Sequence, residues 1–229
     1  MVKTLPEPHR YAVCAPEDIP IKRFYDGVYE EVFIFFHPFM KQKHTEQETV
    51  RTTWNKNNLS DQFEVRTWKE LLHLSKITTV RQLDIGLRTR ILSLRKEKMD
   101  EETALAIDET CQQYNLIAPG EGRLPEILIN PLLKSFQQLG YFWIWCGNEF
   151  GTERKLEAVS DLISKSKLSD DYSNFFTHYN ELLITTHWDS HFSMLCGTKE
   201  VLEAVRLSCH LEGFYCNQKT DIYWSVTTC

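Results

Sequence analysis

Aliphatic and aromatic residues dominate positions 28–36, the first strongly apolar stretch of the chain. Glutamates interrupt a strict alternation of apolar and polar positions, so we predict a strand in which only residues 32–36 are fully buried. His37 and Pro38 follow directly, and proline cannot donate a hydrogen bond to a neighbouring strand. The strand is therefore expected to end there.

The middle of the chain is predicted to be helical. Residues 79–97 show the clearest helical period, because their apolar positions recur every three or four residues. These positions are Val80, Leu83, Leu87, Ile91 and Leu94. Capping boxes that begin at Thr45 and Thr67, each with a glutamate three residues later, predict two further helix starts.

Two more helices are predicted from the residues at their ends. Asp100 is a preferred N-cap residue and precedes a helical pattern over residues 101–115. Asn130 and Pro131 suit the start of a short helix over residues 131–139, since proline is tolerated in the first helical turn.

After residue 140 the pattern changes. The aromatic and apolar run at residues 141–146 predicts a central strand, and residues 152–165 have the period of an amphipathic helix. Two β-rich runs, residues 182–188 and 191–196, flank an Asp-Ser pair, which predicts a tight hairpin.

The chain is predicted to close with a helix and two strands. Thr198 is expected to cap a helix that reaches Cys209, and residues 213–216 and 222–226 are the last predicted strands. The C-terminal part then has the order β-α-β-β-α-β. The fold class is therefore α+β, with a helical middle segment packed on a C-terminal mixed or antiparallel sheet.

We expect one integrated domain over residues 1–229, because the helix over residues 79–97 carries apolar positions on more than one side. Residues 1–27 contain four prolines and are expected to form an extended arm. Residues 28–139 then contribute one strand and several helices, and residues 140–229 contribute the sheet.

Composition narrows the class of protein. The chain of 229 residues is 42% hydrophobic and 25% charged, which is ordinary for a globular protein. Its formal charge of -6 disfavours a whole surface dedicated to nucleic acid or anionic lipid. The apolar runs are far shorter than the roughly 20 residues that span a bilayer, so no membrane partner is expected. Seven scattered cysteines without a Cys-x-x-Cys pair, and no secretory signal, predict reduced thiols and a cytoplasmic location.

The string from His187 to His191 contains the residue types of a metal site. On a continuous strand, His187, Asp189 and His191 would point to one face, where two imidazoles and a carboxylate can hold zinc or iron. In a hairpin with Asp189 in the turn, the two histidines would lie on opposite strands and could face apart. The hairpin interpretation favours histidines without a metal.

Positive charge is concentrated in residues 66–98, which contain nine Lys or Arg and three acidic residues. Arg81, Arg88 and Arg95 recur every seven residues and would line one side of the predicted helix. Such arginines can bind phosphate, or pair with carboxylates of the acidic C-terminal half within the chain or across a dimer. We favour carboxylate pairing over nucleic-acid contact, because no aromatic and basic module accompanies these arginines.

Sequence signatures of common cofactors and catalysts are absent. The chain contains no Gly-x-Gly-x-x-Gly, no phosphate-binding loop, no Gly-x-Ser-x-Gly and no His-Glu-x-x-His. We therefore predict no cofactor and no catalytic residue. The many aromatic residues are interpreted as a large core, with a surplus at an oligomer interface.

Several short motifs taken together resemble a protein family. They are the Phe-His-Pro-Phe sequence at residues 36–39, residues 187–193, residues 211–216 and the late Tyr223-Trp224 pair. The chain is similar in these motifs to an uncharacterised bacterial family of cytoplasmic proteins of comparable length. The resemblance covers most of the chain and implies one complete folding unit, but it brings no activity and no catalytic residue.

The preferred interpretation is a non-enzymatic binding or regulatory protein, with a protein or small-molecule partner and a homodimer as one expected state. The first alternative is a metal-dependent hydrolase or oxygenase that uses His187, Asp189 and His191. The second is a nucleic-acid-associated protein that uses its three regularly spaced arginines.

Overall fold

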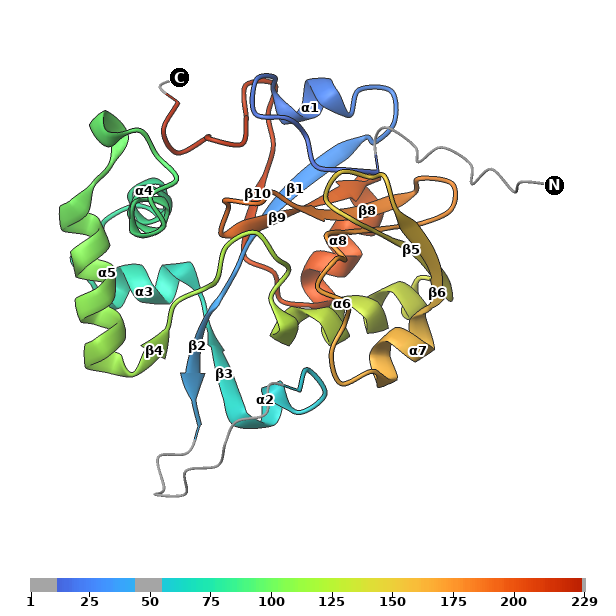
Figure 1. The fold of residues 1–229 in the computed structure, drawn as a ribbon, viewed down its shortest axis with the longest axis horizontal. Helices are drawn as coiled ribbons and strands as arrows, with labels where there is room; N and C mark the ends of the chain where they lie inside the picture. Colours follow the sequence, from blue (N-terminus) through green and yellow to red (C-terminus); the bar gives the residue numbers. More distant parts are fainter. Residues whose placement is uncertain (1–11, 44–54, 228–229) are drawn as a thin grey trace.

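The computed structural model describes residues 12–43 and 55–227, and its centre is a seven-stranded sheet (Figure 1). Every neighbouring pair of strands in this sheet is antiparallel. The strand order is β10 (Gly213–Tyr215), β1 (Glu31–Phe36), β9 (Phe192–Gly197), β8 (Leu182–Thr186), β7 (Asn174–Phe176), β5 (Trp143–Gly147) and β6 (Arg154–Ala158).

A second, three-stranded sheet continues from the first. Its order is β3 (Phe63–Arg66), β2 (Phe39–Gln42) and β4 (Leu116–Ile117). His37 and Pro38 separate β1 from β2, so β1 ends where proline predicts that it should.

Helices surround the large sheet. They are α1 (Ile21–Phe24), α2 (Leu59–Gln62), α3 (Trp68–Leu74), α4 (Val80–Arg90), α5 (Glu101–Tyr114), α6 (Glu126–Gln138), α7 (Val159–Ser164) and α8 (Lys199–Ser208), with a 3-10 turn at Lys96–Lys98. In Figure 1, α3, α4 and α5 form a group at one end, whereas α6, α7 and α8 lie together against the sheet. No helix among the described residues is long and apolar enough to cross a membrane.

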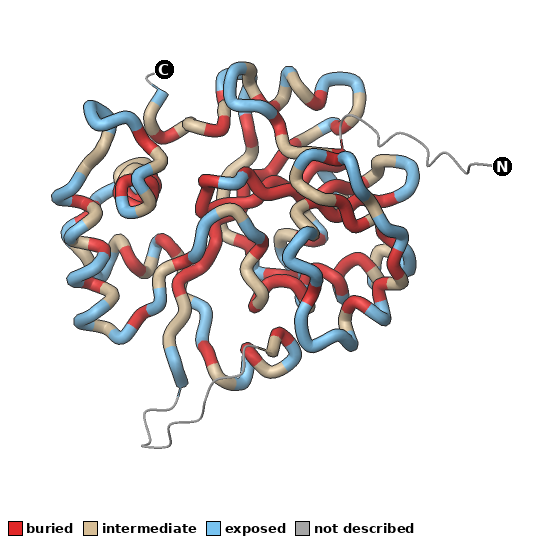
Figure 2. Tube along the Cα trace, viewed as in Figure 1, coloured by how far each residue is buried: buried red, intermediate tan, exposed pale blue. Residues whose placement is uncertain are grey.

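Two hydrophobic cores cover the two faces of the sheet, and β1 contributes to both. Phe33 and Phe35 lie in the core that α6, α7 and α8 complete, whereas Ile34 and Phe36 lie in the core that α1, α3, α4 and α5 complete. A strand buried on both faces needs a continuous apolar run, which explains the pattern of this segment. The buried strands run through the middle of the molecule in Figure 2.

The α+β class is confirmed, and the local signals at several helix starts are confirmed with it. The side chains of Thr67, Asp100 and Thr198 each accept a hydrogen bond from a backbone amide in the first turn of α3, α5 and α8. Thr67 and Glu70 form the complete capping box. The pair Thr45 and Glu48 lies outside the described residues.

The predicted helix over residues 152–165 is wrong in its first half. Residues Arg154–Ala158 form β6 beside β5, and the helix begins only at Val159. Leu156, in the middle of β6, is 44% exposed. β5 therefore has a neighbour on each side that bonds to its backbone, and the C-terminal part contains two more strands, β6 and β7, than the predicted order.

The predicted helix over residues 79–97 is too long. α4 ends at Arg90, and Leu92 adopts a positive φ of 58° with its side chain 76% exposed. The next turn is stabilised by a bond from Ser93 N to Arg88 O and by one from Asp100 N to Thr89 Oγ1. Contacts across the turn therefore stop a helix that the apolar period alone would continue.

Two further boundaries differ from the prediction. α6 begins at Glu126 rather than at residue 131, and Asn130 does not cap a helix but accepts a hydrogen bond from Lys56 Nζ at 2.7 Å. Residues 222–226, predicted as a strand, form successive turns. In these turns the backbone oxygen of Ile222 accepts a hydrogen bond from Arg88 Nη2 at 2.8 Å instead of pairing with a strand.

Candidate functional site

The turn between β8 and β9 organises the polar centre of the molecule. Thr186 pairs with Ser193 across the two strands, and Ser190 N donates a hydrogen bond to His187 O at 3.1 Å. The predicted hairpin is therefore present, with its turn one residue earlier than the Asp-Ser pair indicates. Short polar residues favour such turns.

On one side of this turn, His187 links two carboxylates. Its Nδ1 lies 2.5 Å from Asp189 Oδ1, and its Nε2 lies 3.1 Å from Glu17 Oε1. The three residues offer ligand atoms within 4.8 Å of one another, which is a spacing that a metal ion could use. In the structure, each imidazole nitrogen lies beside a different carboxylate. The arrangement is a hydrogen-bonded chain, Glu17–His187–Asp189.

The structure does not bring His187, Asp189 and His191, the alternative metal site considered from the sequence, into one group of possible ligands among the described residues. His191 is absent from the group, because the turn directs its ring to the opposite side. Asp189 is also fully engaged, since its other oxygen accepts a bond from Tyr223 Oη at 2.9 Å. Burial works against the charge of Asp189, but His187 and Arg88 outweigh it and hold the pKa of this carboxyl below its usual value.

Arg88 lies at the centre of this polar network and has no exposed surface. Its Nε lies 2.9 Å from Asp84 Oδ2, and its Nη2 donates to Ser190 Oγ at 3.0 Å and to Ile222 O at 2.8 Å. Burial disfavours its charge, but the carboxylates of Asp84 and Asp189 more than compensate, so the pKa of Arg88 is raised. The network joins α4, the β8–β9 turn and the C-terminal segment.

The three evenly spaced arginines therefore do not form a surface stripe. Arg88 cannot reach phosphate from inside the protein. Arg81 donates to the backbone oxygens of Ser225 and Thr227 near the end of the chain. Arg95 is exposed and follows the end of α4 by five residues, so the helical spacing that would align it with the others is lost.

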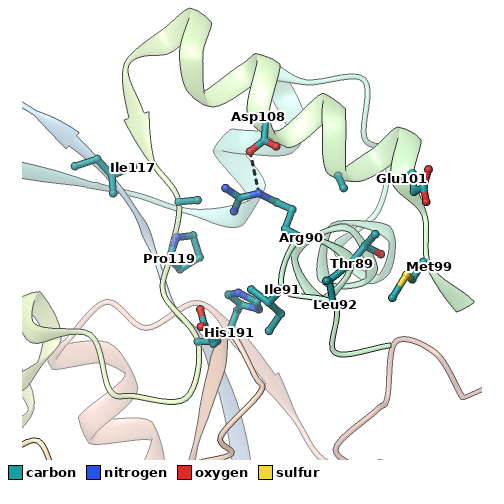
Figure 3. Close-up of a pocket in the computed structure, with 13 residues that line it drawn as sticks. Thr89, Arg90, Ile91, Leu92, Met99, Glu101, Asp108, Ile117, Pro119 and His191 are labelled. Carbon is teal, nitrogen blue, oxygen red and sulfur yellow. Dashed lines mark hydrogen bonds and ion pairs between the residues drawn. The ribbon is translucent and has the colours of Figure 1, made fainter. Parts of the chain in front are cut away.

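A pocket of about 630 Å³ lies on the other side of the turn, between the end of α4, α5 and the segment after β4 (Figure 3). Its polar lining residues are Thr89, Arg90, Glu101, Asp108, Glu121 and His191. Its apolar lining residues are Ile91, Leu92, Met99, Ala104, Ile117, Ala118 and Pro119. We call this space the α4–α5 pocket.

His191 is the unusual residue of the α4–α5 pocket. It is only 1% exposed, and its Nδ1 is buried without a hydrogen-bond partner among the described residues. Burial, with help from the charges of Arg88 and Arg90, lowers the pKa of His191 to about 3, so the ring is neutral near pH 7. An unpaired buried polar group costs about 1–3 kcal/mol, and such a cost calls for an explanation.

Arg90 supplies the positive charge of the pocket. Its Nε lies 2.9 Å from Asp108 Oδ1 on α5, which holds the guanidinium across the space between the two helices. In Figure 3 its terminal nitrogens lie on the side away from Asp108, toward Pro119. These nitrogens form no hydrogen bond with any residue in the described part of the chain.

The family of the chain can now be stated beside this geometry. Residues 17–226 of the chain match a protein family whose description is "Protein of unknown function (DUF2711)". The chain belongs to this family. The resemblance to an uncharacterised family is thereby confirmed, and the matched range contains Glu17, the Arg88 network and the whole α4–α5 pocket. No significant match exists among curated proteins or among solved structures.

This DUF2711 member also contains a serine and histidine pair that resembles a catalytic dyad. His37 Nε2 lies 2.8 Å from Ser193 Oγ, and His37 Nδ1 lies 3.2 Å from Gly120 O. Both side chains are completely buried, so no substrate can approach the hydroxyl. Burial lowers the pKa of His37 to about 3. The pair therefore ties β1, β9 and the segment after β4 together.

The cysteines of this DUF2711 member do not have the properties of nucleophiles. All six that the structure describes are free, and four of them are buried. Burial raises the pKa of Cys146 and of Cys216 to about 12, which leaves almost no thiolate near neutral pH.

Sequence reasoning missed Arg90 and Asp108 as partners in this DUF2711 site. Arg90 contributes to the excess of positive charge in residues 66–98, but nothing local distinguishes it from Arg88 or Arg95. The bond between Arg90 and Asp108 depends on how α4 and α5 pack. Only the tertiary structure brings the two residues together.

Proposed function

We propose that this protein binds a small zwitterionic molecule, with the chemistry of an amino acid, in the α4–α5 pocket. The observation that carries the proposal is the guanidinium of Arg90, which Asp108 holds through Nε at 2.9 Å while the terminal nitrogens bond to no described residue. The neutral ring of His191 lines the same pocket and adds no charge to it. The preferred interpretation of the sequence, a non-enzymatic binding protein, agrees with this role.

Arg90 would hold the anionic group of the ligand. A guanidinium presents donors in a planar fork that matches a carboxylate, and paired bonds of this kind define orientation as well as affinity. Asp108 engages only Nε, so the terminal nitrogens remain available for the ligand. The pair with Asp108 also holds the guanidinium in place before binding.

The charges around Arg90 favour a ligand that also carries an ammonium group. Glu101, Asp108 and Glu121 line the pocket and outnumber the single arginine, while His191 contributes no charge. A ligand with only negative charge would meet this excess of carboxylates without compensation. An ammonium placed near them would balance it.

The size and the apolar lining suit a molecule of this class. Small-molecule pockets in proteins typically enclose about 300–1,000 Å³ and combine apolar walls with a few polar groups. The space of about 630 Å³ lies within this range, and Met99, Ile117 and Pro119 provide apolar walls for a side chain.

The test is calorimetric titration of the full chain with common amino acids, each compared with its deaminated and its decarboxylated analogue. We expect at least one amino acid to bind, and both of its analogues to bind more weakly because each lacks one charged group. Saturation near 100 times Kd should also stabilise the fold by about 2.7 kcal/mol.

Three variants define the site. Arg90→Gln should weaken binding about 10- to 100-fold, since a hydrogen bond to a charged group contributes about 1.5–3 kcal/mol. His191→Phe should weaken binding as well, whereas Arg95→Gln changes an exposed arginine outside the pocket and should bind as the wild type does. Absence of binding to every amino acid, or equal binding by Arg90→Gln and Arg95→Gln, would reject the proposal.

A further inference from the structure

The strand β6 forms one edge of the seven-stranded sheet. It pairs with β5 on one side, and no described strand pairs with its outer side. Figure 1 shows it at the margin of the molecule, with α7 following it. An open edge offers unpaired backbone groups to another strand, and proteins usually cover or disrupt such an edge.

Two hydrogen bonds just beyond the ends of the β5–β6 pair reveal which backbone groups of β6 face outward. Val159 N donates to Phe142 O at 2.9 Å, and Asn148 N donates to Glu153 O at 3.0 Å. In an antiparallel ladder, directly bonded pairs alternate with unbonded pairs along the strands. The bonded positions of this ladder on the β6 side are therefore the odd-numbered residues from 153 to 159.

The even-numbered residues consequently direct their amide and carbonyl groups away from β5. Leu156 is the central one, and its side chain is 44% exposed. Lys155 and Glu157 flank it, bond to β5 through their backbones, and lie on the same face of the strand as each other.

We infer that two copies of this chain pair through β6, antiparallel and about a two-fold axis at Leu156. Leu156 would then face Leu156 of the partner subunit as a directly bonded pair, with two backbone hydrogen bonds at the axis. Such an isologous contact is the commonest form of homodimer. The two sheets would continue into one another.

The charges next to the axis are complementary in this register. Lys155 would lie opposite the partner's Glu157, and Glu157 opposite the partner's Lys155. These are unbonded positions, where side chains of an antiparallel pair lie closest and where opposite charges stabilise pairing. Within one chain, Lys155 Nζ already lies 2.8 Å from Glu157 Oε1, so both charges are present at this edge.

Exposed aromatic side chains lie beside the same edge. Trp143 pairs with Ala158 across β5 and β6 and is 60% exposed, and Phe142 is 62% exposed. Interfaces are enriched in aromatic residues, and each buried aromatic ring adds considerable apolar area. These side chains enlarge a contact that five strand residues alone would leave small.

The first test is the mass of the full chain by light scattering and by sedimentation. We expect twice the chain mass of 27.0 kDa. Leu156→Pro removes one outward amide that β5 does not use, so the variant should fold but remain a monomer. Leu156→Val keeps the amide and should remain a dimer.

A charge exchange tests the register. Lys155→Glu alone, and Glu157→Lys alone, would place like charges opposite one another and should each weaken dimerisation. An equal mixture of these two variants should form heterodimers, because both contacts across the axis then join opposite charges. Circular dichroism reports whether each variant folds, since Glu157 also contacts Lys165 and Tyr172 within the chain.

Two results would overturn the inference. One is a monomeric wild type at the highest soluble concentration. The other is a dimer that persists unchanged in Leu156→Pro and in Lys155→Glu, which would locate the interface elsewhere. Neither measurement depends on the α4–α5 pocket, so this inference and the proposed ligand can fail separately.

Discussion

The β8–β9 turn separates two polar regions that are built on different principles. On one side, Arg88 and Asp189 lie in a dense network in which carboxylates, a hydroxyl and backbone oxygens surround a single guanidinium. On the other side, Arg90 and His191 line a hollow of about 630 Å³. The two arginines are only two positions apart on α4, yet one belongs to the scaffold and the other to a candidate site.

The comparison shows what distinguishes a functional polar group from a structural one. Buried polar atoms in proteins are nearly always paired. Around Arg88 most polar atoms have partners, but Asp84 Oδ1 is buried without one among the described residues. The unpaired Nδ1 of His191 also breaks this rule, beside an open pocket. The difference lies in the open space beside Arg90 and His191 and not in residue type, because histidine, arginine and aspartate occur on both sides.

The largest change in stability is expected from substitution of Arg88, with the same substitution of Arg90 as the comparison. Arg88→Leu should lower the free energy of unfolding by about 3–5 kcal/mol, because it leaves the buried carboxylates of Asp84 and Asp189 without their cation. Arg90→Leu, two residues away, should lower it by less than about 1 kcal/mol, since the pair with Asp108 is partly exposed. Urea denaturation of both variants measures the difference. Equal losses would show that the two regions do not differ as described.

The next largest change in stability is expected on acidification and involves two of the buried histidines, His37 and His191. His37 and His191 each have a folded-state pKa of about 3, well below the value of about 6.5 in an unfolded chain. The unfolded state therefore binds protons that the folded state does not. Stability should be constant above about pH 7 and fall with acidification, by up to about 1.4 kcal/mol per pH unit for each histidine. Denaturation midpoints between about pH 7 and 5 test this, above the range in which carboxylates titrate.

Phenylalanine substitutions separate the two histidines in the same experiment. His191→Phe and His37→Phe should each remove about half of the acid sensitivity. Near neutral pH they should differ, because His37 bonds to Gly120 O and Ser193 Oγ, whereas Nδ1 of His191 has no described partner to lose. We expect a loss of about 1–3 kcal/mol for His37→Phe and little change for His191→Phe. A large loss for His191→Phe would contradict its assignment to an open site.

The smallest change in stability is expected from substitution of Glu17, at the solvent-exposed end of the chain Glu17–His187–Asp189. Glu17→Gln removes the charge that faces His187 Nε2 and should lower stability by at most about 1 kcal/mol, because Glu17 is 42% exposed and solvent screens the pair. A thermal melt against the wild type is sufficient. A larger loss would mean that the chain Glu17–His187–Asp189 holds the N-terminal segment more firmly than its exposure indicates.

Local sequence determined the parts of this protein that depend on neighbouring residues. The caps at Thr67, Asp100 and Thr198 act within one helical turn, and the apolar run of β1 reports burial on both faces. The β8–β9 hairpin follows from two apolar runs and a short polar link. These features were predictable because the interactions that specify them span only a few residues.

Tertiary structure alone decided the candidate site and the edge of the sheet. The hydrogen bond from Arg88 to Ile222 joins residues 134 positions apart, and it draws residues 222–226 into turns instead of a strand. Packing of α4 against α5 brings Arg90 to Asp108, and the open side of β5 turns residues 154–158 into a strand. A sequence pattern describes which face of an element is apolar, but it does not specify which distant element supplies the partner of a polar group.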